Sequence, residues 1–369
     1  MTTSTETAIT LCRTPLYHAL KTVIGVVESA QILQILSFVK LEFNGSTLTL
    51  TATDTSIELR TTCQAQTLNT QSSFVATLPG KKLLDICKNL PDDSELTLAQ
   101  KKDWMIISTS SSQFTLATLP HDSFPASHPI NSHCSVTLEE SQLVDLFQRT
   151  SFAMAHQDVR HYLNGVHLKV TPDSLQTTAT NGHRLAIYPI AATTGISDAA
   201  EVILPKKTVQ ELMRLLDMQS DTSLQIHFSE QQIIFEHPHF TLTSHLLLGN
   251  YPNCHALIPQ NPPFIATVDR LSLKQALQRA AIISLDKFKS ARFVFSHNHL
   301  AIHALNNEKE KTDETVSMTY NGEDLTMAFN IQYVLDVLNI LDGDTVTLAL
   351  TDPKSCILMT DHTLPKLEV

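Results

Sequence analysis

Glycine is scarce in this sequence, and the few glycines present lie far apart. Nine glycines occur in 369 residues, and no two of them are closer than 13 positions. Glycine-rich phosphate loops and the G-x-S-x-G elbow of hydrolases need clustered glycines, because their backbone must approach a phosphate or turn sharply. The spacing therefore excludes both kinds of catalytic loop.

Metal and redox motifs are also lacking. The six cysteines form no C-x-x-C pair, which argues against a zinc ribbon or a thioredoxin-type site. The 17 histidines include no H-E-x-x-H, and those in loop-like stretches show no metal-ligand spacing. The sequence predicts no metal, no cofactor and no catalytic residue, with reduced thiols as in a cytoplasm.

Long apolar runs are absent as well. No run approaches the ~18 residues that a membrane span needs. The segment Met1–Thr10 is polar and lacks the basic-then-apolar pattern of a signal peptide. Hydrophobic residues make up 42% and charged residues 17%, which is typical of folded domains. We expect a cytoplasmic protein of two or three domains with no membrane partner.

A strand–helix–strand pattern occurs three times along the chain. The three helical windows carry Leu83, Val209 and Val334 at equivalent positions, 126 and 125 residues apart. Apolar residues follow at i+3, i+4 and i+7 in each window, as on one face of a helix. An acidic residue stands two positions after Leu83, Val209 and Val334 in the respective copies; these acidic residues are Asp85, Glu211 and Asp336.

A second, weaker set of three helical windows is also repeated, with one window upstream of the first helix in each copy. It begins near Leu16, Leu143 and Leu273. Between the helices, polar and apolar residues alternate with period two, as in strands. Examples are residues 47–53, 114–118 and 240–244. Asn321–Gly322 is typical of a hairpin turn.

These repeats predict an α+β chain of three similar units, each with about two helices and eight strands. The predicted domains are residues 1–128, 129–260 and 261–369. Chance similarity among amphipathic helices is the alternative, but two helices in register over three copies argue against it.

Charge is unevenly distributed. The net charge is −11, yet the six helical windows contain ten Lys and Arg against six Asp and Glu. Lysine pairs begin two equivalent windows, at Lys81–Lys82 and Lys206–Lys207, where positive charge opposes the helix dipole. Contact with phosphate is one reason for such cations, and a solvated helix start is the other.

Several segments resemble the beta subunit of bacterial DNA polymerase III, the sliding clamp family. They are Ser151–Gly165, Thr180–Ala186, Pro205–Lys207, Ser284–Phe288 and Phe329–Asp336. The similarity runs from about residue 10 to residue 358. It implies a non-enzymatic, ring-shaped homodimer with three tandem clamp domains per subunit, each with two helices packed on antiparallel sheets.

The resemblance also implies function and partners. A clamp encircles duplex DNA of any sequence, slides along it and tethers proteins through a peptide-binding pocket. The implied partners are DNA, a second copy of the chain, the replicative polymerase, the clamp loader, other polymerases and repair proteins that carry clamp-binding peptides.

The resemblance assigns site residues to three groups. It implies DNA contacts for Lys81, Gln157, His161 and Tyr162, to which helix charge adds Lys82, Lys206, Lys207 and Arg279. The peptide pocket matches Leu163, Thr180, Gly182, His183, Arg184, Leu185, Pro252 and Leu257. The two sides of the dimer interface match Phe114 and Leu116, and Ile282 and Ile283.

The sequence departs from the family at three places. Ala30 and Ala256 stand where the family often has arginine. The family ends in a Met-Pro-Met-Arg-Leu-like strand that forms one wall of the pocket, whereas this chain ends in a shortened segment, residues 358–369. We expect an altered wall and a lower peptide affinity.

Two other functions are weighed against the clamp. A hydrolase or transferase could use a pair such as His156 and Asp158, but near neighbours on one element rarely converge on a substrate, and no nucleophile accompanies them. A protein-binding scaffold without DNA would make the positive helices incidental.

Overall fold

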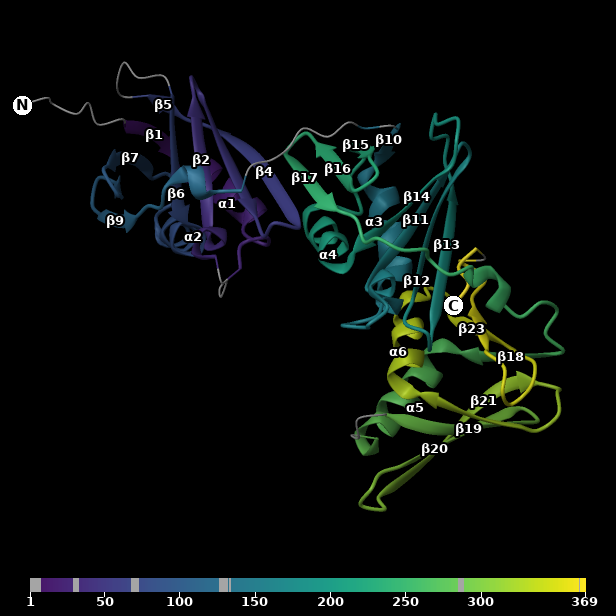
Figure 1. The fold of residues 1–369 in the computed structure, drawn as a ribbon. Helices are drawn as coiled ribbons and strands as arrows, with labels where there is room; N and C mark the ends of the chain where they lie inside the picture. The colour runs from purple at the N-terminus through teal and green to yellow at the C-terminus, as the bar shows by residue number, and fades with distance from the viewer. Residues whose placement is uncertain are drawn as a thin grey trace, which may run out of the picture. The chain divides into compact units, whose positions relative to one another are not determined.

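The computed structural model describes residues 8–28, 33–67, 73–125, 132, 134–284, 289–364 and 366–369. These residues form six α-helices and 24 strands (Figure 1). None of the helices in the described ranges is long and apolar enough to cross a membrane. Ala30 and residues 285–288 of one family-like segment lie outside the described residues.

A similar order of elements occurs three times; the first repeat has the extra two-residue strand β5, and the third has one strand fewer after its second helix. The first repeat contains β1 (Ala8–Cys12), α1 (Arg13–Val23), β2 (Phe38–Asn44), β3 (Thr47–Thr53), β4 (Ile57–Gln64), β5 (Gln66–Thr67), β6 (Ser73–Pro79), α2 (Gly80–Asn89), β7 (Glu95–Lys101), β8 (Trp104–Ser108) and β9 (Gln113–Ala117). The second contains β10 (Cys134–Glu139), α3 (Glu140–Thr150), β11 (Gly165–Thr171), β12 (Ser174–Thr180), β13 (Leu185–Ala191), β14 (Ala200–Pro205), α4 (Lys206–Leu215), β15 (Ser223–Phe228), β16 (Gln232–His237) and β17 (Phe240–His245). The third contains β18 (Phe264–Asp269), α5 (Arg270–Ile283), β19 (Ser290–Ser296), β20 (His299–Leu305), β21 (Lys311–Tyr320), β22 (Leu325–Asn330), α6 (Ile331–Ile340), β23 (Thr345–Leu350) and β24 (Leu358–Thr360). The predicted α+β class with repeated units is confirmed.

The helices form where their apolar faces can be buried. Leu83 and Cys87 of α2 are fully buried, and so are the equivalent Val209 of α4 and Leu338 of α6. The Asn330 side chain caps α6 by accepting hydrogen bonds from the backbone N–H groups of residues 332 and 333. Each helix is therefore held in place by burying its apolar stripe against a sheet, as the spacing of its apolar residues predicts.

The strands form four antiparallel sheets in two compact units. Residues 1–142 with 210–246 form the first unit, and residues 143–209 with 247–369 form the second. The first unit holds the sheets β5-β1-β7-β8-β9 and β10-β15-β16-β17-β4-β3-β2-β6. The second holds β13-β12-β11-β14 and β22-β19-β20-β21-β18-β23-β24. The units divide the chain differently from the three predicted domains, because sheets continue across repeat boundaries.

In the first unit, β17 of the second repeat pairs with β4 of the first repeat. Their antiparallel register places Leu242 opposite Leu59, and both side chains are fully buried. Two repeats therefore share one eight-stranded sheet, joined by backbone hydrogen bonds and an apolar contact. We call this pairing the first junction.

The second unit contains an equivalent junction between the second and third repeats. Ile187 of β13 and Glu368 exchange backbone hydrogen bonds of 2.9 and 3.0 Å. Arg149 of α3 reinforces this second junction. Its guanidinium donates to the carbonyl of Ile340 at the end of α6 and to the carboxylate of Asp342, 2.6 Å away.

The hairpin predicted at Asn321–Gly322 is wrong. These residues connect β21 to β22, which do not pair, because β22 lies next to β19 at the other side of the sheet. A Cβ at Gly322 would collide with the rings of Tyr320 and Phe264. Glycine is therefore required here by close packing and not by a tight turn.

Replacing Arg149 with methionine should lower the free energy of unfolding by about 2–4 kcal/mol, since two hydrogen-bonded carboxylates and a carbonyl lose a largely buried partner. Urea denaturation measures this loss. The exposed Lys354→Met is the control, with an expected change below about 0.5 kcal/mol. Equal effects of the two substitutions would contradict a stabilising role for Arg149.

Candidate functional site

A cavity of about 230 Å³ opens on the second unit. The turn between β12 and β13, the short helix Cys254–Leu257, α6 and the C-terminal segment all contribute to it. Its lining residues are Thr180, Gly182, His183, Arg184, Leu185, Leu257, Ile258, Pro259, Phe329, Tyr333, Val334, Val337, Cys356, Ile357, Leu358, Met359, Glu368 and Val369. Most of these side chains are apolar, so the cavity suits large apolar groups of a ligand.

The turn at Thr180–Arg184 is held by its own side chains. The Thr180 hydroxyl donates to the carbonyl of Arg184 and accepts from the N–H of Gly182. The Asn181 side chain accepts from the N–H groups of His183 and Arg184. Gly182 has φ +86°, a conformation that favours glycine. The sequence Thr-Asn-Gly-His-Arg thus forms a rigid edge of the cavity.

Arg184 is fixed in the cavity wall. Its guanidinium donates to the carboxylate of Asp336 and to the carbonyl of Phe152. It also lies 4.6 Å from the ring centroid of Tyr333 and 5.3 Å from that of Phe152. The arginine charge is therefore already paired within the wall. The recurring acidic position noted in the sequence, here Asp336, acts as its partner.

The C-terminal segment forms part of the wall despite its unusual sequence. Leu367 is fully buried in the core of the third repeat, and the N–H of Met359 donates to the carbonyl of Val369 at 2.7 Å. Glu368 pairs with Ile187 at the second junction. The shortened segment therefore reaches the cavity, and the expected loss of affinity stays a prediction.

The structure places the predicted pocket residues in two groups. Six of them line the cavity: Thr180, Gly182, His183, Arg184, Leu185 and Leu257. Leu163 is buried and Pro252 is exposed, and neither belongs to the lining. Sequence reasoning did not assign Phe329, Tyr333 or Val337 to the pocket. The family-like segment Phe329–Asp336 was the signal that could have placed Phe329 and Tyr333 here, whereas Val337 was explained by helix periodicity.

A braced loop at residues 155–164 carries three predicted DNA contacts. The Asn164 side chain accepts from the N–H of Asp158 and donates to its carbonyl, both at 2.9 Å. Gln157, with φ +54°, and His161 are exposed on this loop, and Tyr162 is half-buried. The loop is thus held closed while its polar side chains face outward.

In the pair His156 and Asp158, the carboxylate is bound to another residue. Hydrogen bonds from Arg160 lower the pKa of Asp158 to about 2, and the two side chains form an ion pair at 2.9 Å. The carboxylate is therefore committed to Arg160 at neutral pH. No group of three His, Cys, Asp or Glu residues that could hold a metal ion occurs in the described ranges.

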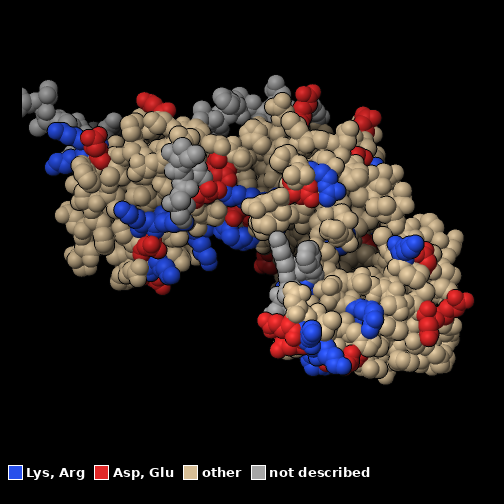
Figure 2. Space-filling view, turned by 60° about the horizontal axis from the view of Figure 1, so that its bottom comes forward, with Lys and Arg blue, Asp and Glu red and all other residues tan. Residues whose placement is uncertain are grey.

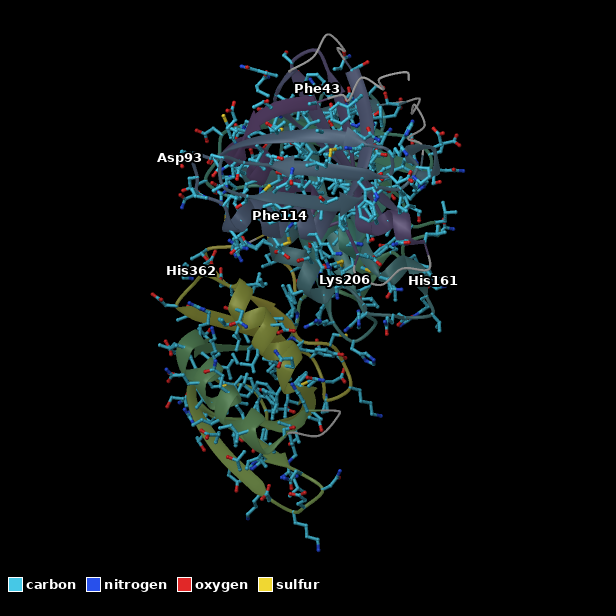
Figure 3. All side chains as sticks on the ribbon, turned by 90° about the vertical axis from the view of Figure 1, so that its left-hand side faces the viewer. Phe43, Asp93, Phe114, His161, Lys206 and His362 are labelled. Atoms are coloured by element: carbon cyan, nitrogen blue, oxygen red, sulfur yellow. The ribbon has the colours of Figure 1, made fainter. Side chains whose placement is uncertain are left out.

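The predicted DNA-binding cations lie at helix starts and on helix faces. The N–H of Lys206 donates to the carbonyl of Asn164 at 3.1 Å, so the start of α4 adjoins the braced loop; Figure 3 labels Lys206 and His161 on these segments. Lys81 and Lys82 are exposed at the start of α2. Arg279 of α5 is paired with Glu314 at 2.6 Å, which reduces its availability to another anion.

Charge of both signs is spread over the face shown in Figure 2, between wide uncharged areas. On the face shown, cations are separated from one another by uncharged or acidic residues. Separated cations of this kind attract phosphate weakly and in a salt-sensitive way.

The predicted interface residues lie on an edge strand and at the end of a helix. Phe114 and Leu116 are half-buried on β9, the edge strand of its sheet, where Figure 3 labels Phe114. Ile282, at the end of α5, is 65% exposed, and Ile283 is half-buried. An exposed isoleucine beside a second apolar residue is a candidate contact for another protein surface.

Three family models match successive parts of the chain. They describe the N-terminal, central and C-terminal domains of the DNA polymerase III beta subunit and match residues 7–128, 137–253 and 255–368. The beta sliding clamp of Pseudomonas putida is 37% identical over 350 residues, with 95% of each chain covered. That of Escherichia coli K12 is 35% identical over 352 residues, again with 95% of each covered.

Solved structures agree with these relatives. The DNA polymerase sliding clamp from Pseudomonas aeruginosa, crystallised with a ligand, superposes with a TM-score of 0.92 at 35% identity. The DNA polymerase III beta subunit from Bartonella birtlesii bound to griselimycin gives a TM-score of 0.93 at 30% identity. Each comparison covers 98% of both chains.

Asp361 should hold the C-terminal wall of the cavity in a pH-dependent way. This residue is 4% exposed and accepts hydrogen bonds from the N–H groups of residues 342, 343, 363 and 364. Burial by itself raises the pKa of Asp361. The hydrogen bonds from the backbone N–H groups and from the Thr363 hydroxyl lower it by more, so the net pKa lies below the ordinary 3.8. Its stabilising contribution is therefore complete above pH 3.8 and is lost as the pH falls through the lower folded value.

Asp361→Asn should cost about 2 kcal/mol of stability at pH 7, because an amide can accept fewer of these bonds and carries no charge. Denaturation of both proteins at pH 7, 5 and 3 gives the difference in unfolding free energy. We expect an equal difference at the two higher pH values and a smaller one at the lowest. A difference that grows at the lowest pH would show the assigned sign to be wrong.

Proposed function

The chain belongs to the DNA polymerase III beta subunit family and is a DNA sliding clamp, and we propose that it works as a closed ring of two head-to-tail copies around duplex DNA. The observation that carries the proposal is the repeated junction: the chain joins its own repeats twice by antiparallel backbone pairing, once through strands β17 and β4 and once through the bridge between Ile187 and Glu368. A ring needs no catalytic group, since it retains DNA by closure. We propose accordingly that the chain is not an enzyme.

Two strand edges equivalent to these junctions lack a partner, along all or part of their length, within the described parts of the chain. β9 ends its sheet and corresponds to β17 as the last strand of a repeat. β21 corresponds to β4; it pairs with β20 along residues 311–317, and with β18 only along residues 318–320. A second copy placed head to tail supplies a partner to each edge and closes the ring after two subunits.

The first junction also predicts the register between the copies. Thr243 of β17 lies opposite Glu58 of β4. Aligning β9 with β17 makes Ala117 the equivalent of Thr243, and aligning the hairpins β3–β4 and β20–β21 makes Lys311 the equivalent of Glu58. We therefore propose that Ala117 of one subunit lies opposite the partner subunit's Lys311.

Helix ends support the same assignment. At the first junction, Gly25 lies so close to the carboxylate of Glu211 that a Cβ would not fit. At the second, the equivalent residue Phe152 packs against the core of the third repeat. The third equivalent is the exposed Ile282. We therefore propose an interface in which Phe114 and Leu116 of one subunit meet Ile282 and Ile283 of the partner.

Sliding follows from DNA contacts that are weak and independent of the base sequence. Lys81, Lys82, Lys206 and Lys207 offer point charges to phosphates at two equivalent helix starts. The braced loop adds polar side chains that can touch the duplex. Closure of the ring then prevents dissociation, while each contact stays weak enough for movement.

The cavity is proposed to tether other proteins. An apolar cavity with a polar edge can bury one or two large side chains of a short peptide and hold its backbone by hydrogen bonds. The proposed partners are the replicative polymerase, the clamp loader, other polymerases and repair proteins in the bacterial cytoplasm. None of them requires a cofactor in this chain.

Retention on DNA should depend on topology. Clamps loaded by their own loader onto a nicked circular duplex should stay bound during gel filtration and should leave after the circle is cut. Retention that survives cutting would indicate ordinary binding, and failure to load at all would favour a scaffold without DNA. Lys82→Glu and Lys206→Glu should weaken loading equally on all sequences, lowering the salt slope by about 0.9 per lost phosphate contact. Lys354→Glu is the control.

Cysteine pairs should test the ring register. In a background with Cys12 and Cys356 replaced by serine, Ala117→Cys with Lys311→Cys should form a disulfide-linked dimer, because opposing residues in antiparallel strands lie within disulfide reach. Ala117→Cys with Thr312→Cys, whose side chains face opposite sides of the sheet, is the matched control. More efficient linkage of the control pair would show the register to be wrong.

Ile282→Asp should shift the dimer towards monomer in sedimentation experiments, since an unpaired charge would be buried at the interface. An unchanged dimer would remove this residue from the interface.

Leu185→Asp should reduce the affinity for a clamp-binding peptide more than tenfold, because it places a charge in the apolar lining. Fluorescence titration measures the affinity, and the exposed Leu271→Asp on α5 is the control. Unchanged affinity of the Leu185 variant would exclude this cavity as the tethering site.

A further inference from the structure

Glu368 is the only acidic residue among the described residues that line the cavity. The other ionisable lining residues are His183, Arg184, Tyr333 and Cys356. The charge of Arg184 is paired with Asp336, which lies behind the lining. The charge that a ligand meets in the cavity therefore depends strongly on Glu368.

The register of the second junction places the Glu368 side chain on the cavity face. Opposed residues of an antiparallel bridge project to the same side, so Glu368 shares a face with Ile187. Leu185, two residues before Ile187 on the same strand, projects to that face and lines the cavity. Leu367 projects to the other side and is fully buried in the core of the third repeat, while the terminal Val369 packs against that core and also lines the cavity.

Among the described residues, the Glu368 carboxylate has no hydrogen-bond or ion-pair partner. The residue is half-buried. Its backbone, in contrast, is fixed by two hydrogen bonds to Ile187. A fixed, unpaired carboxylate beside apolar side chains favours a cation and disfavours an anion in the same space.

We propose that Glu368 makes the cavity selective for peptides that carry a lysine or arginine next to their large apolar anchor. The apolar lining holds the anchor, and the neighbouring basic side chain pairs with the carboxylate at the edge. An acidic residue at the same peptide position is repelled. The inference rests on the proposed peptide-binding function and defines the chemistry of the partner.

Three synthetic peptides test this selectivity. They share one apolar anchor and differ at the adjacent position, which is lysine, glutamine or glutamate. The unmodified protein should bind the lysine peptide roughly three- to tenfold more tightly than the glutamate peptide, as expected for half-exposed charge pairs. The preference should shrink when salt is raised from 50 mM to 500 mM.

Glu368→Gln should remove the preference, and Glu368→Lys should reverse it, with little change in affinity for the glutamine peptide. Glu201→Gln changes a half-exposed carboxylate of β14 that is paired with Lys169 outside the cavity, and it should leave the preference intact.

Equal binding of all three peptides to the unmodified protein would overturn the inference and leave peptide tethering standing. A preference that survives Glu368→Gln would assign the selectivity to another group and would also overturn it. Failure of every peptide to bind, including the glutamine peptide, would overturn both this inference and the proposed tethering.

Discussion

Backbone hydrogen bonds between β17 and β4, and between Glu368 and Ile187, join one repeat to the next, and the rest of the structure depends on these two junctions. Each repeat leaves strand edges that would be open if it stood alone. Pairing an edge with the neighbouring repeat satisfies its backbone groups and buries apolar residues such as Leu59 and Leu242. Sheet continuity, more than the loops between repeats, therefore organises the chain.

The cavity is a product of the second junction. Its turn, Thr180–Arg184, belongs to the second repeat, whereas Tyr333 and the C-terminal residues belong to the third. Arg184 crosses between them to reach Asp336. The same side chains that stabilise the junction thus shape the wall on which a peptide is proposed to bind, so the site is as rigid as the junction itself.

Periodicity in the sequence was sufficient to predict the helices and the repeats. Spacings such as Leu83, Val209 and Val334 report which side chains a helix buries, and burial is a local demand repeated in each copy. Junctions are different, because nothing in the periodicity of β4 indicates that its partner is more than 180 residues away in β17. The same limit explains why Tyr333 was assigned to a helix and not to the cavity, and why Arg279 was not expected to pair with Glu314.

The two internal junctions are tied by the polypeptide itself, and this has a consequence for how a ring opens. A strand pair whose two halves belong to one chain re-forms at a high effective concentration, which is set by the intervening segment and does not change on dilution. An identical pairing between separate chains has only the bulk concentration of protein to restore it. Strand pairs of equal strength would then open first where no covalent link spans them. A clamp built in this way would therefore open at a subunit interface while its two internal junctions remain closed.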